Sequence, residues 1–87
     1  MVRLIDTNVL VYRFDPRDPV RQSTANQVLR DGLVRDDLIL PHQAVIEFVA
    51  ATTRPRAALD GRPLLNQDEA ITEAESLMRA VPHAVSH

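Results

Sequence analysis

Two short apolar runs separated by a helical segment constrain the fold of this chain more than any other feature. Residues 2–6 and residues 38–41 are each typical of a short buried strand, and Pro41 ends the second because it cannot donate to a sheet ladder. Between them, Asp18 followed by Pro19 is a helix-start signal, since proline needs no N–H partner in the first turn. Strand, helix and strand within about forty residues predict a parallel βαβ unit with a right-handed crossover.

The helix that begins near Pro19 is predicted to bury one apolar side. Gly32 is a candidate end for this helix, although the apolar spacing extends to about Val34. The residues predicted to share the buried side are Val20, Thr24, Ala25, Val28, Leu29 and Leu33.

The first strand delivers one carboxylate, Asp6, to its carboxyl end. In open parallel sheets, ligands bind just beyond such strand ends. An acid at that place is costly unless it is exposed to a ligand, paired, or bound to a metal. Residues 7–12 are predicted to open a helical turn with Thr7 or Asn8 as its cap. The alternative is that Asp6 itself is a structural cap for the turn at Asn8.

A second acid lies in a segment that is otherwise almost without polar residues, from His42 to Thr53. A helix that is apolar all round is buried, so this segment is predicted to be a buried helix. Glu47 is the only acid in it and therefore needs a partner. The alternative is that Glu47 lies on a helix face that reaches solvent. His42 is interpreted as a helix-start residue beside Pro41 rather than as a general base.

The remaining segments are a basic loop and a second amphipathic helix. Residues 54–65 contain Arg54, Arg56 and Arg62, interpreted as a solvated loop with RNA phosphate contact as the alternative. Asn66 and Glu69 form a capping-box pattern that begins a helix with apolar residues at helical spacing from residue 70 to residue 81. Residues 81–87 are too short to assign and could begin a third strand.

Length and composition bound the class of protein. Eighty-seven residues allow one small domain. The net charge of −2 gives no general argument for nucleic-acid binding, and the absence of cysteine excludes disulfides and cysteine-ligated metals. No apolar run is long enough to span a bilayer, and no secretory signal is recognised, so we expect a cytoplasmic protein without membrane contact.

Asp6 and Glu47 are both expected at the same edge of the βαβ unit. Each follows a parallel strand, and the carboxyl ends of neighbouring parallel strands meet at one edge. Hard cations such as Mg²⁺ or Mn²⁺ bind carboxylate oxygens and keep several waters. A metal ion between two such acids can generate a hydroxide nucleophile and stabilise charge on a phosphate.

Together these stretches resemble the N-terminal part of a PIN domain, most closely the VapC-type toxins of bacterial toxin–antitoxin pairs. The resemblance is carried by Leu-Ile-Asp-Thr-Asn-Val-Leu-Val-Tyr at residues 4–12 and Leu-Ile-Leu-Pro-His-Gln-Ala-Val-Ile-Glu-Phe at residues 38–48. The Asp-Pro turn before the first long helix and the Thr-Arg-Pro sequence at residues 53–55 are also similar.

The resemblance implies a three-layer α/β/α fold with a parallel sheet and a Mg²⁺- or Mn²⁺-dependent endoribonuclease. Its partners would be an RNA substrate and a cognate antitoxin, and the full domain would form a homodimer. Asp6 and Glu47 match the first two metal-binding acids, and Thr7 and Asn8 match the small polar residues that support the first.

The sequence also departs from the family pattern. The family cluster has a further Asp that begins a later helix reading roughly Asp-Ala-Leu-Ile-Ala, and no acid of this chain lies in that context. Residues 1–87 are therefore expected to be an incomplete PIN domain that lacks its C-terminal part. The alternative function is a catalytically inactive remnant that binds only an antitoxin or another protomer.

Overall fold

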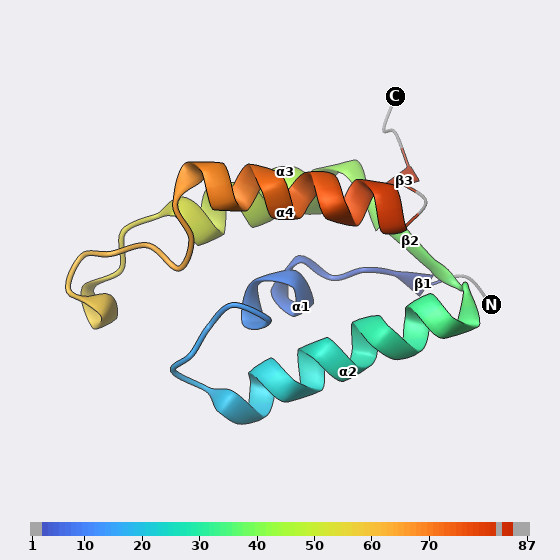
Figure 1. Ribbon diagram of the computed structural model, residues 1–87, viewed down its shortest axis with the longest axis horizontal. Helices are drawn as coiled ribbons and strands as arrows, with labels where there is room; N and C mark the ends of the chain where they lie inside the picture. The colour runs from blue at the N-terminus through green and yellow to red at the C-terminus, as the bar shows by residue number, and fades with distance from the viewer. Residues whose placement is uncertain (1–2, 82, 85–87) are drawn as a thin grey trace.

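The computed structural model describes residues 3–81, 83 and 84 of the chain. The fold class is mixed α/β, as the sequence predicts. Its elements are, in order, β1 (Arg3–Leu4), α1 (Thr7–Tyr12), α2 (Pro19–Arg35), β2 (Leu38–Pro41), α3 (His42–Thr53), the 3₁₀ turn η1 (Ala57–Leu59), α4 (Gln67–Ala80) and β3 (His83–Ala84). In Figure 1, α3 and α4 run along each other on one side of the molecule and α2 lies on the other.

The strands pair in parallel, in the order β1-β2-β3. Arg3 lies opposite Leu38 in the β1–β2 pair, which confirms the parallel strand–helix–strand unit. β1 ends at Leu4, two residues before the predicted end, although the Ile5 N–H still donates to the Ile39 carbonyl at 3.0 Å. Val2, which is also predicted to lie in this strand, is outside the described residues. The segment that the sequence left unassigned contains a third strand, β3, with His83 opposite Leu40. Residues 82 and 85–87 of that segment lie outside the described residues.

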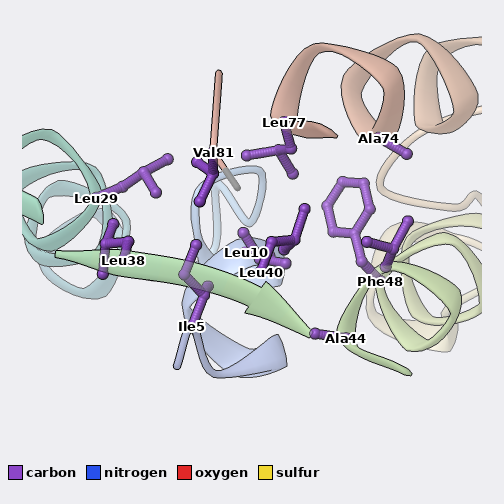
Figure 2. Packing of buried hydrophobic residues seen from close by; sticks show 11 residues of the cluster. Ile5, Leu10, Leu29, Leu38, Leu40, Ala44, Phe48, Ala74, Leu77 and Val81 are labelled. Carbon is purple, nitrogen blue, oxygen red and sulfur yellow. The ribbon is translucent and has the colours of Figure 1, made fainter. Parts of the chain in front are cut away.

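The hydrophobic core lies where α1, α3 and α4 meet the inner face of β2. Leu10, Leu40 and Phe48 are fully buried there, and Figure 2 shows the Phe48 ring beside Ala74 and Leu77 of α4. Burial of such side chains is the main term that favours folding in a chain of this size.

Helix α3 is not buried all round, so that sequence prediction is wrong. Ala44, Val45 and Phe48 are buried, whereas Ile46 is 52% exposed and Glu47 is also exposed. The reason is that α1, α4 and β2 cover only one side of α3. The alternative interpretation, in which Glu47 lies on a face that reaches solvent, is confirmed.

Helix α2 begins where predicted. The Asp18 side chain caps it by accepting from the Arg21 N–H at 3.0 Å, with Pro19 in the first turn. The helix continues to Arg35 and ends at Asp36 in the left-handed conformation, with φ of 56°. Gly32 as the helix end is therefore wrong.

The predicted buried side of α2 is only partly correct. Ala25 and Leu29 are buried with Gly32, whereas Val20 is 75% exposed and Val28 and Leu33 are also exposed. Contacts from α1 and β2 reach a narrow stripe of this helix. The rest of its apolar side is left at the surface, where Thr24 also lies.

Helix α4 confirms both its predicted start and its helical spacing. Asn66 accepts from the Glu69 N–H at 2.8 Å, and the Glu69 carboxylate accepts from the Asn66 N–H at 3.0 Å. Ala70, Ala74 and Leu77 are buried, as expected from their spacing. In the described part of the chain, no helix combines the length and apolar character needed to cross a membrane.

The loop between α1 and α2 contains a buried acid, Asp15, that is paired with Arg17. The guanidinium donates to both carboxylate oxygens, at 2.8 and 2.7 Å, and the Arg17 N–H also donates, at 3.1 Å. These bonds, chiefly those from the side chain, lower the pKa of Asp15 from 3.8 to about 2, although burial opposes the shift. Asp15 therefore stabilises the fold at neutral pH.

We expect Asp15→Asn to lower the free energy of unfolding by about 1–2 kcal/mol at neutral pH, because solvent around the half-exposed Arg17 screens the pair. A depressed pKa stabilises the folded state fully above the unfolded value and ceases to do so as the pH falls through the folded value. The difference between the two proteins should thus vanish as the pH falls from about 4 to about 2. Urea unfolding at a series of pH values measures it, with Glu75→Gln as the control. A difference that persists at the lowest pH would contradict this assignment.

Candidate functional site

The candidate site lies where α1 and α3 begin. Residues 38–41 form β2, which passes directly into α3 at His42, and β1 is followed within three residues by α1. Because β1 and β2 are parallel neighbours, the two helices start at the same edge of the sheet. Leu10 of α1 and Phe48 of α3 are both fully buried in the core shared by the two helices. His42 is confirmed as a helix-start residue.

Glu47 is held by donors from two helices. The Thr7 hydroxyl of α1 donates to Glu47 Oε2 at 3.0 Å, and the Gln43 side-chain amide of α3 donates to Oε1 at 3.2 Å. Thr7 directly follows Asp6, so the structure brings the second predicted acid against the segment that carries the first. The carboxylate itself is exposed to solvent.

Asp6 is the cap of α1. Its backbone is extended, with φ of −78° and ψ of 137°, and its Oδ1 accepts from the Asn8 N–H at 2.9 Å. The alternative interpretation of Asp6 as a structural cap is therefore confirmed, and Thr7 or Asn8 as the cap is wrong. Among the described residues, Asp6 Oδ2 accepts no hydrogen bond, so capping leaves one oxygen of this exposed acid for a ligand.

The carboxylate oxygens of Asp6 and Glu47 are of the chemical type that binds hard cations. Asp6 and Glu47 offer carboxylate oxygens at an exposed edge, and Mg²⁺ is commonly held by one or two carboxylates with water completing its shell. Within residues 3–81, 83 and 84, no group of three or more His, Cys, Asp or Glu side chains is arranged to hold a metal.

The two arginines predicted as possible RNA contacts have different surroundings. Arg54 caps the end of α3 and is exposed. Arg56 is half-buried, and its guanidinium donates to the Ala51 carbonyl at 2.9 Å near the end of the same helix. Arg56 therefore helps to satisfy the carbonyls that end α3, and Arg54 is the more accessible cation.

Gln43 belongs to the site although sequence reasoning did not identify it. Its spacing from Glu47 is i to i+4, at which helix side chains are neighbours, so the pair was detectable from the sequence. The contact of Thr7 with Glu47 spans forty residues and had no such local signal.

Comparisons with family models, with curated proteins and with solved structures found no match to this chain.

Proposed function

We propose that this chain is a PIN-type domain of the VapC toxin kind that hydrolyses RNA with the help of Mg²⁺ or Mn²⁺. In this proposal, the chain forms the first part of a three-layer α/β/α domain. The observation that supports it best is the hydrogen bond between Thr7 and Glu47. That bond joins the two stretches on which the family resemblance rests.

Asp6 and Glu47 are the residues that would hold the metal ion. Asp6 accepts from the Asn8 N–H and Glu47 accepts from Thr7 and Gln43, and these bonds reduce the side-chain freedom that would be lost when an ion binds. When bound, the ion would supply an activated water and would offset negative charge on the phosphate.

The proposed partners follow from the same resemblance. Single-stranded RNA would be the substrate, and Arg54 is an exposed cation of the type that contacts backbone phosphates. A cognate antitoxin would neutralise the enzyme, and a complete domain would form a homodimer in the cytoplasm.

The test is cleavage of single-stranded RNA by the purified chain in the presence of Mn²⁺. Asp6→Asn is the sharpest variant, because asparagine caps a helix as well as aspartate does while removing the charge. Glu47→Gln likewise keeps the length and the oxygen that accepts from Thr7. We expect each to reduce cleavage at least tenfold, since even outer-shell partners of metals typically contribute ~10–100-fold.

Glu75→Gln is the matched control, because Glu75 is an exposed acid on α4, outside the proposed site. It should cleave RNA as the unmodified chain does. Equal, metal-dependent cleavage by all four proteins would show that Asp6 and Glu47 have no part in the chemistry.

A second candidate is an inactive binding module, and a surface feature favours it. Two adjoining hollows of about 120 and 270 Å³ lie between α2 and the segment from β1 to α1, and Val9 and Val28 line both. Leu4, at the same place, is 68% exposed. Apolar surface of this kind marks interaction sites in many proteins. Absence of cleavage by the folded, unmodified chain is the result that this candidate predicts.

A further inference from the structure

We infer that Gln43 is a positioning residue that sets the orientation of Glu47 for metal binding. The inference rests on the proposed function, because it assigns a role toward the same ion. Gln43 is not part of the acidic pattern, and the structure shows that its side-chain amide donates to Glu47.

The two oxygens of Glu47 each have a different donor. Oε1 accepts from Gln43 on the same helix, and Oε2 accepts from Thr7 across the α1–α3 contact. An exposed glutamate has considerable rotamer freedom that binding would have to remove. Two donors, one to each oxygen of the carboxylate, restrict that freedom beforehand, which favours binding by preorganisation.

The chemical nature of Gln43 suits this role. A lysine or arginine at this position could also donate, but its positive charge would repel a bound cation. The neutral amide donates without adding charge. Each oxygen of a carboxylate has more than one lone pair, so an oxygen that accepts from Gln43 can still bind a metal.

A second glutamine–carboxylate pair, on α2, provides a comparison because it is a surface contact within a single helix. On α2, the Gln27 amide donates to Asp31 Oδ1 at 2.9 Å with the same i to i+4 spacing. In the described structure, Asp31 has no second side-chain donor from another element, whereas Glu47 has Thr7. Gln27 is therefore the matched control for Gln43.

The experiment compares Mn²⁺ affinity of the unmodified chain, Gln43→Met and Gln27→Met, measured from the free-ion signal in electron paramagnetic resonance. Methionine keeps the side-chain length and removes the donor. We expect Gln43→Met to weaken Mn²⁺ binding about tenfold and Gln27→Met to leave it unchanged. Circular dichroism of each protein confirms that the fold is retained.

A second measurement separates failure of this inference from failure of the proposed function. Substoichiometric Mn²⁺ should broaden the backbone amide resonances of Thr7 and Asn8 in the unmodified chain and should not do so in Asp6→Asn. If this broadening occurs but Gln43→Met binds Mn²⁺ as tightly as Gln27→Met does, Gln43 has no positioning role and the metal site stands. If no broadening occurs in the unmodified chain, the metal site and the role of Gln43 are both overturned.

Discussion

Replacing Phe48 with alanine is expected to lower the free energy of unfolding by about 3–5 kcal/mol. Phe48 is fully buried, and its ring packs against Phe14 with the centroids 5.8 Å apart and the planes tilted by 54°. It also lies beside Ala74 and Leu77, so a single side chain joins α3 to α4 and to the segment after α1 (Figure 2). Typical domains are stable by only about 5–15 kcal/mol, so this loss would remove a large share of the free energy of unfolding.

Urea denaturation followed by circular dichroism measures this loss. The control is Ile46→Ala on the same helix, since Ile46 is half exposed and its removal leaves no cavity in the core. We expect that change to stay within about 0.5 kcal/mol. Similar losses for the two variants would mean that α3 does not pack through the side that carries Phe48.

Gly32→Val is expected to destabilise the fold by about 2–3 kcal/mol, because α2 packs too closely on β2 at this point for any side chain. A Cβ atom at position 32 would lie 2.3 Å from Leu38 Cδ1 and 2.4 Å from Leu38 Cγ. Removing a glycine from a helix interior gains at most about 1 kcal/mol, which is less than the cost of overpacking. The steric conflict with the buried Leu38 side chain is therefore the larger effect, and Gly32→Val should lower the free energy of unfolding.

A double-mutant cycle tests whether Leu38 is the cause. Leu38→Ala alone removes a buried side chain and should cost about 2–5 kcal/mol. In the double variant, the valine side chain introduced by Gly32→Val would occupy part of the vacated space, so the combined loss should fall short of the sum of the two by about 1–3 kcal/mol. Arg30→Val, at an exposed position of α2, controls for valine in this helix. Additive losses would show that the conflict lies elsewhere.

The helix starts at Asp18 and Asn66 could be predicted because their causes are local. Each side chain accepts from a backbone N–H three residues later, so the residues that make the contact are close in the sequence. The parallel pairing of β1 and β2 could also be predicted, because a helical connection between two strands leaves little other choice.

Which sides of helices α2 and α3 are buried could not be predicted as well as where the helices begin. The composition of α3 suggested a helix covered on all sides, but the number of neighbouring elements decides how much of a helix is covered. Gly32 likewise resembles a helix end in the sequence, whereas its real role is to let α2 approach Leu38. Both errors concern contacts between elements, about which local patterns carry little information.

The sequence by itself determined the α/β class and the helix starts at Asp18 and Asn66, because periodicity and residue chemistry over short spans decide them. Only the tertiary structure decided that the Glu47 carboxylate accepts from Thr7, forty residues earlier in the chain. The physical reason is that the hydrogen bond from Thr7 to Glu47 depends on how α1 packs against α3. That packing is set by the core they share with β2 and α4, and no local pattern encodes it.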